Sequence, residues 1–255
     1  MVDQDLLFQQ SAEKLSQQGL NLCAVFDLTQ LPESVFEVLR ATQINLDNYS
    51  RLVMLGNGGK LFWHALAQSE QRQVDNVGVG PSDPIDRFSL HLTQVMIDEI
   101  SSSSAGRQLI LYPQTEHFIP LQQLGELAGW GTPSPIGNSI SAEYGLWFAF
   151  RSAFLTSIPL LPSQFEHQPS PCLTCISKPC QTACPAGAVV DTAAGFKLDA
   201  CIDHRLKEKS PCVFHCLARQ ACPIGIEHQY PEPAVKQLYG ASLSAIQIWQ
   251  NRSRK

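Results

Sequence analysis

The chain has 255 residues, of which 44% are hydrophobic and 16% charged, and its formal net charge is −5. A chain of this size forms one large domain, or a medium domain joined to a smaller one, and the composition excludes disordered, collagen-like and coiled-coil proteins. The best apolar run, residues 145–155, is interrupted by Arg151 and is too short to cross a membrane. The acidic N-terminal segment does not have the basic region of a signal peptide, so we expect a cytoplasmic protein with no membrane partner.

The charge is unevenly distributed along the chain. Residues 1–165 contain 8 Lys or Arg and 16 Asp or Glu, whereas residues 166–255 contain 10 and 7. A nucleic-acid surface needs clustered basic side chains. The acidic first part therefore argues against nucleic acid as a partner.

Helix and strand patterns alternate in the first part of the chain. Helical spacing predicts helices over residues 6–18, from 31–33 onward, and over 60–68, 85–101 and 120–129. Apolar runs predict strands over residues 20–28, 51–57, 107–113 and 139–161, and residues 76–84 form a Gly- and Pro-rich loop. Such alternation is typical of an α/β or α+β domain, here residues 1–165, and the four prolines of residues 159–171 mark its end.

Nine cysteines are present, and eight of them fall into two groups that each end in Cys-Pro. The first group is Cys172, Cys175, Cys180 and Cys184, and the second is Cys201, Cys212, Cys216 and Cys222. The ninth, Cys23, sits within an apolar strand pattern, where a free cysteine packs as a small hydrophobic residue.

The two groups follow the logic of a two-cluster ferredoxin, in which the last cysteine of each group binds the other cluster. That crossing assigns Cys172, Cys175, Cys180 and Cys222 to one 4Fe-4S cluster, and Cys184, Cys201, Cys212 and Cys216 to the other. Two zinc sites of four thiolates are the alternative, although zinc ribbons pair C-x2-C units and do not repeat Cys-Pro. Disulfides would need an oxidising compartment. Both groups depart from the compact ferredoxin spacing, the second more than the first.

A two-cluster module beside a larger domain implies electron delivery to a redox centre in that domain. The Gly-rich segment GNGGK, residues 56–60, either places backbone N–H groups against an anion or makes a tight strand-to-helix turn.

Three segments resemble a known group of proteins. DPIDRF at residues 83–88 and the segment at 118–158 resemble cobalamin-processing proteins of the cblC type, with Asp83 where those proteins have His. The AGWG and GN motifs, the following apolar run and the cysteine groups resemble epoxyqueuosine reductases and reductive dehalogenases, and Cys201 matches their isolated cysteine. The resemblance implies an α+β fold: a nitroreductase-like, corrin-binding domain (residues 1–165), a two-cluster ferredoxin-like domain (166–230) and a C-terminal helix and tail (231–255).

The resemblance does not extend to every part of the epoxyqueuosine reductases. Epoxyqueuosine reductases carry a further helical-repeat region that helps to hold tRNA, whereas this chain ends about 30 residues after Cys222.

Arg151 interrupts an apolar strand and needs a partner, either a carboxylate such as Asp86 or an anionic ligand group. Tyr144 and Trp147 either line a cofactor or belong to the core.

The expected function is that of an iron–sulfur oxidoreductase. Two 4Fe-4S clusters would deliver electrons to a cobalamin-type cofactor, and the partners would be a flavodoxin- or ferredoxin-type electron donor and a small-molecule substrate. The alternative is a non-catalytic electron-transfer protein whose first domain docks a partner.

Overall fold

The computed structural model describes residues 4–72, 83–102, 105–114, 116–190 and 195–253. Most of the loop predicted at 76–84 lies outside these residues. The chain divides into two compact units. The first unit comprises residues 1–130 and 148–167, and the second comprises residues 131–147 and 168–255. Among the helices of the described residues, none has both the length and the apolar character needed to span a membrane.

The first unit is built on a four-stranded antiparallel sheet with strand order β1-β2-β6-β3. Its strands are β1 (Leu22–Asp27), β2 (Arg51–Gly58), β3 (Gln108–Tyr112) and β6 (Phe148–Thr156). The sheet is covered on both faces, which explains why β2 and β6 read as nearly continuous apolar runs instead of alternating patterns.

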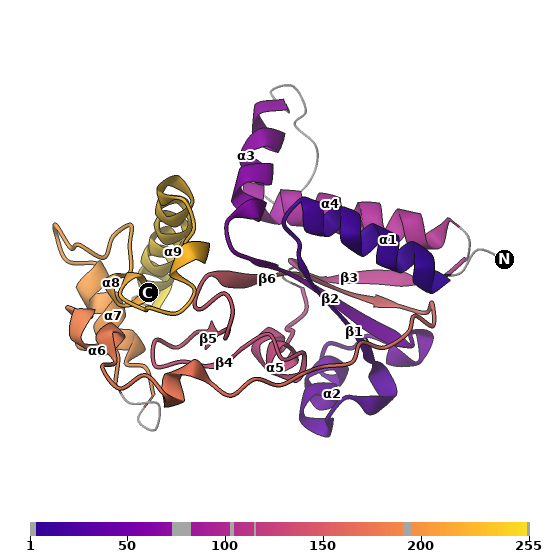
Figure 1. The fold of residues 1–255 in the computed structure, drawn as a ribbon, viewed down its shortest axis with the longest axis horizontal. Coiled ribbons are helices and arrows are strands. Elements are labelled where there is room, and N and C mark those ends of the chain that lie inside the picture. The colour runs from indigo at the N-terminus through magenta and orange to yellow at the C-terminus, as the bar shows by residue number, and fades with distance from the viewer. Residues whose placement is uncertain (1–3, 73–82, 103–104, 115, 191–194, 254–255) are drawn as a thin grey trace. The chain divides into compact units, whose positions relative to one another are not determined.

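The described α-helices of the first unit lie on or beside this sheet, and α3 extends away from it (Figure 1). They are α1 (Gln4–Gln17), α2 (Glu33–Arg40), α3 (Leu61–Arg72), α4 (Pro84–Ser101) and α5 (Leu121–Leu127). Helices α2 and α5 bury Leu39 and Leu124 in a core cluster with Leu52 and Met54 of β2. Helices α1 and α4 pack together on the other face, and α4 begins at a well-formed cap in which the Asp83 carboxylate accepts a hydrogen bond from the Ile85 N–H at 2.8 Å.

The second unit contains short elements and one long helix. They are β4 (Thr132–Pro133), β5 (Ser139–Ile140), α6 (Pro179–Ala183), α7 (Leu198–Arg205), α8 (Leu217–Gln220) and α9 (Glu232–Ser253). In its core, Ile136, Ile140 and Leu146 pack together with Cys172, Cys180, Cys184, Cys216 and Cys222. The segment 131–147, which precedes β6 in the chain, thus packs with the cysteine-bearing segment.

The sequence prediction of strands throughout residues 139–161 is wrong for residues 157–161, which follow the end of β6, and for residues 141–147. These residues form a turn closed by a bridge between Ser141 and Gly145, and the long strand begins only at Phe148. The cause is a close approach: a Cβ atom on Gly145, at φ +57°, would stand 1.9 Å from the carbonyl oxygen of Ile224. Apolar composition alone does not reveal that a glycine must meet another backbone segment.

Candidate functional site

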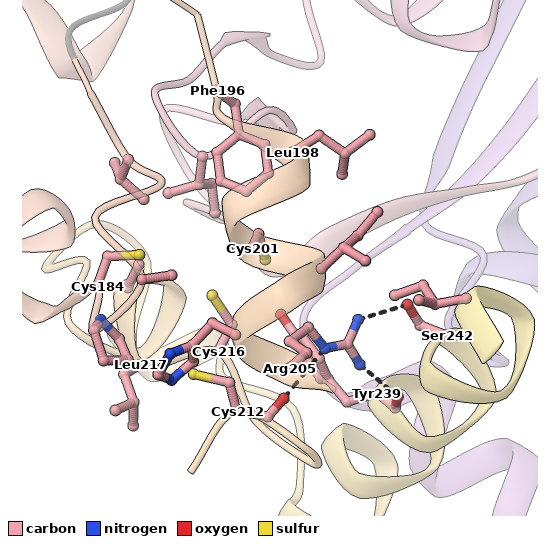
Figure 2. A pocket seen from close by; sticks show the side chains of 18 of the residues that line it. Cys184, Phe196, Leu198, Cys201, Arg205, Cys212, Cys216, Leu217, Tyr239 and Ser242 are labelled. Atoms are coloured by element: carbon pink, nitrogen blue, oxygen red, sulfur yellow. Dashed lines mark hydrogen bonds between the residues drawn. The ribbon is translucent and has the colours of Figure 1, made fainter. Parts of the chain in front are cut away.

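The eight clustered cysteines separate into two sets of four, each lining its own cavity in the second unit. Cys184, Cys201, Cys212 and Cys216, hereafter the Cys184 set, line a cavity of about 610 Å³ (Figure 2). Cys172, Cys175, Cys180 and Cys222, hereafter the Cys172 set, line a cavity of about 30 Å³. Cys222, the last cysteine of the second sequence group, thus belongs to the Cys172 set. Cys184, the last cysteine of the first group, belongs with Cys201, Cys212 and Cys216.

The electrostatics of the thiols divide in the same way. Burial raises the pKa of Cys201 and of Cys212, and the charges of other thiols in the Cys184 set raise both further. Burial likewise raises the pKa of Cys172, Cys180 and Cys222, and again the contributing thiols belong to their own set. Partly buried thiols whose charges raise one another's pKa need a positive occupant or neighbour before they can become thiolates together.

Two short helices produce the exchange between the sets. Cys180 lies in α6 and Cys184 caps its end, while Cys216 caps the start of α8 and Cys222 follows two residues after its end. Helices α6 and α8 pack against each other. Each helix therefore carries one cysteine toward each set, because its two ends point in opposite directions.

Arg205 is the charged side chain most closely tied to the Cys184 set. It lies one turn after Cys201 on α7, so both side chains occupy the same face of the helix. The residue is 7% exposed, and its guanidinium donates to the carbonyl of Cys212 at 3.2 Å, to the Ser242 hydroxyl at 3.0 Å and to the Tyr239 carbonyl at 2.8 Å (Figure 2). Within the described residues none of its hydrogen-bond partners is a carboxylate, although its charge lowers the pKa of Cys201 and Cys212 against the effect of burial.

A second buried arginine, Arg219, extends this arrangement. Its guanidinium donates to the Leu146 carbonyl at 2.6 Å and lies 4.4 Å from the centre of the Trp147 ring. Its guanidinium also lies 5.2 Å from the centre of the Tyr230 ring. Burial raises the pKa of Tyr239, which lines the cavity of the Cys184 set, to about 12.

The sequence reasoning missed Arg205, Arg219 and Tyr239. A signal existed for the two arginines, because each follows a cysteine by four or three residues, one helical turn. Tyr239 lies 23 positions after Cys216 and only the packing of α9 brings it there. In the Cys172 set, the charge of Lys178 lowers the pKa of Cys172 against the effect of burial.

The fit of a metal group can be tested on these residues. Within the described chain, no three His, Cys, Asp or Glu side chains stand close enough together to hold a single metal ion. A cubane cluster is a larger body, and its thiolates stand farther apart than the ligands of one ion. The Cys184 set has the required space, the required four thiols and a buried cation to balance an anionic occupant. The cavity of the Cys172 set has the four thiols but not that space, so the proposal of a second cluster rests on the cysteine spacing and not on the cavity.

Arg151 belongs to the first unit and lies at a bulge of β6, where the pairing with β2 shifts register. Its Nε donates to the Asn57 side chain at 2.6 Å, and its guanidinium lies over the rings of Phe62 (4.6 Å) and Trp63 (5.3 Å). Burial and the charge of Asp83 raise the pKa of Asp86. The charge of Arg151 acts in the opposite direction and lowers that pKa. Of the two partners predicted for Arg151, the carboxylate is therefore nearby.

Tyr144 and Trp147 belong to the second unit. Trp147 is 1% exposed, and its ring packs edge-on against Tyr230 with centroids 5.4 Å apart. Tyr144 packs in the same manner against His228 at 4.8 Å. Both residues thus pack within the second unit, and their role in lining a cofactor stays a prediction.

No family model matches the chain, and no curated protein matches it. Solved structures do match. An epoxyqueuosine reductase has a TM-score of 0.58 at 14% identity, covering 92% of this chain and 70% of that one. The epoxyqueuosine reductase of Streptococcus thermophilus has a TM-score of 0.55 at 12% identity, covering 89% and 67%. The B12-trafficking protein CblC of C. elegans has a TM-score of 0.53 at 15% identity, covering 93% and 96%.

These likenesses define the class of fold. The chain has the mixed α/β fold that epoxyqueuosine reductase and CblC share.

Proposed function

We propose that the protein is an iron–sulfur oxidoreductase in which two 4Fe-4S clusters supply electrons to a cobalamin-type cofactor. The observation that carries the proposal is the separation of eight cysteines into two exchanged sets, each with four thiols at one cavity. Clusters of this kind transfer single electrons. The chain's own residues would bind the iron through the eight thiolates, balance its charge through Arg205 and exclude water with the apolar core around the cysteines.

The corrin part of the proposal is supported by the shared fold, since one protein of this fold is a B12-trafficking protein. Arg151 is the residue that we propose to meet an anionic group of the cofactor or of a co-substrate, because it is a buried cation at a strand irregularity. We propose a small-molecule substrate. One epoxyqueuosine reductase structure holds a modified tRNA stem loop, but the acidic residues 1–165 of this chain do not favour a phosphate backbone.

An electron donor must reach the cysteine sets, and one surface suits it. Leu173 and Ile176, which flank Cys175, are 81% and 99% exposed. The segment 167–190 that carries them contains Lys178 and no Asp or Glu. We propose that a small acidic carrier of the flavodoxin or ferredoxin type docks there. The same surface would serve the second candidate function, a non-catalytic electron-transfer protein.

The first experiment is chemical analysis of anaerobically purified protein. Two clusters predict about eight iron atoms and about eight acid-labile sulfides per chain, with a broad visible absorbance that bleaches on reduction. A variant in which Cys23 is replaced by Ala serves as the matched control, because Cys23 belongs to neither set. Stoichiometric zinc without sulfide would overturn the proposal, and about four iron atoms would reduce it to one cluster.

A further inference from the structure

Arg219 lies between two cysteines that belong to different sets. It occupies α8, three residues after Cys216 and three residues before Cys222. Cys216 lines the cavity of the Cys184 set, and Cys222 lines that of the Cys172 set. Because three residues make about one helical turn, a contact that fixes Arg219 also limits the positions of both thiols.

The guanidinium of Arg219 is fixed by contacts with other segments of the second unit. The residue is 8% exposed and donates to the Leu146 carbonyl at 2.6 Å. Its guanidinium lies 4.4 Å and 5.2 Å from the ring centres of Trp147 and Tyr230, and these rings pack edge-on against each other at 5.4 Å. A planar guanidinium lies against an aromatic face while its edge donates hydrogen bonds, and a lysine ammonium has no such plane.

A second contact with the same stretch of chain lies on the other side of Cys222. A Cβ atom on Gly225 would stand 2.3 Å from the carbonyl carbon of Tyr144, so the two backbones touch there. Arg219 contacts residues of this stretch before Cys222, and Gly225 contacts it after Cys222. Residues 144–147 therefore hold Cys222 from both sides.

We propose that Arg219 is a positioning residue that places one cysteine of each set at once, by fixing α8 against residues 144–147. This inference rests on the proposed function, in which both thiols are cluster ligands. Arg205 has a narrower place, since its hydrogen bond to the Cys212 carbonyl at 3.2 Å involves a cysteine of the Cys184 set. Loss of Arg219 should therefore disturb both clusters, and loss of Arg205 only the cluster of the Cys184 set.

The experiment compares Arg219→Met, Arg205→Gln and the wild-type protein, each purified anaerobically as the full-length chain. Absorbance follows the release of iron to a chelator, and paramagnetic resonance of the reduced protein reports each cluster. We expect Arg219→Met to alter both resonance signals and to release the iron of both clusters about tenfold faster or more, because loss of a hydrogen bond from a charged group corresponds to about tenfold or more in an equilibrium. Arg205→Gln should alter one signal and leave the other unchanged.

Two further variants separate positioning from charge and from general stability. Arg219→Lys keeps the charge but has no planar group, so we expect it to disturb both clusters as well. Val235→Ala removes buried methyl groups from α9 of the same unit. It should lower the denaturation midpoint without altering either resonance signal.

The outcomes separate this inference from the proposed function. Unchanged signals and iron release in Arg219→Met, or a change confined to one cluster, would overturn the positioning role alone. Full restoration in Arg219→Lys would assign the effect to charge, and an equal change in Val235→Ala would assign it to stability, so either result also overturns it. If Arg219→Met does not fold, Arg219→Lys decides: two disturbed clusters support the role and wild-type behaviour overturns it. Wild-type protein without iron and sulfide would overturn both the inference and the proposed function.

Discussion

Buried cations without carboxylate partners are costly, and Arg205 and Arg219 are two such residues in the described part of the second unit. They are 7% and 8% exposed, and their hydrogen bonds within the described residues go to carbonyl and hydroxyl oxygens. Dipoles of this kind compensate a buried guanidinium only in part. An anionic group in the cavity of the Cys184 set would supply the rest, which is the physical reason for placing a thiolate-bound cluster there.

Cys23 provides a contrast with the other thiols. It lies on β1, and burial raises its pKa from 9.0 to about 12. At pH 8 only about one Cys23 thiol in ten thousand is then a thiolate, so we expect it to resist iodoacetamide in the folded protein and to react after unfolding. Mass spectrometry of the alkylated peptides measures this directly.

The same shift predicts a dependence of stability on pH. The unfolded chain loses the Cys23 proton above its ordinary pKa while the folded chain keeps it. The contribution of Cys23 is therefore fully present below pH 9.0 and declines as pH rises toward about 12. Cys23→Ala should cost about 1 kcal/mol of packing at neutral pH and remove that decline. An equal decline in the variant would assign it to other groups.

At the scale of elements, α6 and α8 impose the exchange of cysteines. Cys222 follows α8 and belongs to the Cys172 set, so Cys222→Ser should damage the cluster of the Cys172 set. Cys184 caps the end of α6 and belongs to the Cys184 set, so Cys184→Ser should damage the cluster of the Cys184 set. Paramagnetic resonance of each reduced variant identifies the surviving cluster. The same surviving signal in both variants would contradict the exchange.

The two Cys-Pro turns end in glycines that share a backbone conformation but not an environment. Gly187 and Gly225 have φ of +58° and +67°. A Cβ atom on Gly187 would meet nothing within 4 Å, whereas one on Gly225 would stand 2.3 Å from the carbonyl carbon of Tyr144. Gly187→Ala should cost about 1 kcal/mol for its positive φ, and Gly225→Ala about 1–3 kcal/mol more.

Equilibrium denaturation of the two glycine variants, with iron content measured in parallel, tests this difference. Equal losses would mean that the turn 141–145 yields without cost. A loss confined to Gly225→Ala would identify this contact as a structural tie between segment 131–147 and the cysteine-bearing segment.

Sequence patterns predicted most elements of the first unit because local spacing determines them. The helix at 84–101 and the strands at 22–27, 51–58 and 108–112 lie where periodicity and apolar runs placed them. Residues 141–147 were misjudged because their conformation depends on a contact with Ile224, 79 positions after Gly145. The place of Tyr239 in the cavity of the Cys184 set was missed for the same reason, because Tyr239 lies 23 positions after Cys216.

At the scale of the molecule, the two units would have to act as one electron-transfer system. Under the proposed function, clusters held by the two cysteine sets pass electrons to a cobalamin-type cofactor. An electron-transfer protein would carry the same cysteines and bind no corrin. Binding of cobalamin therefore separates the two candidate functions.

Anaerobic protein should retain hydroxocobalamin through a desalting column, and dithionite-reduced protein should reduce it faster than dithionite alone does. Arg151→Leu should weaken retention by about tenfold or more, since a charge-assisted hydrogen bond contributes about 1.5–3 kcal/mol, and should leave the iron content unchanged. Arg51→Leu is the matched control: Arg51 pairs with Asp27 at 3.1 Å in β2, so its loss should lower thermal stability without affecting retention. Absence of retention in the wild-type protein at every practical concentration would favour the electron-transfer protein, because the clusters would then have no acceptor within their own chain.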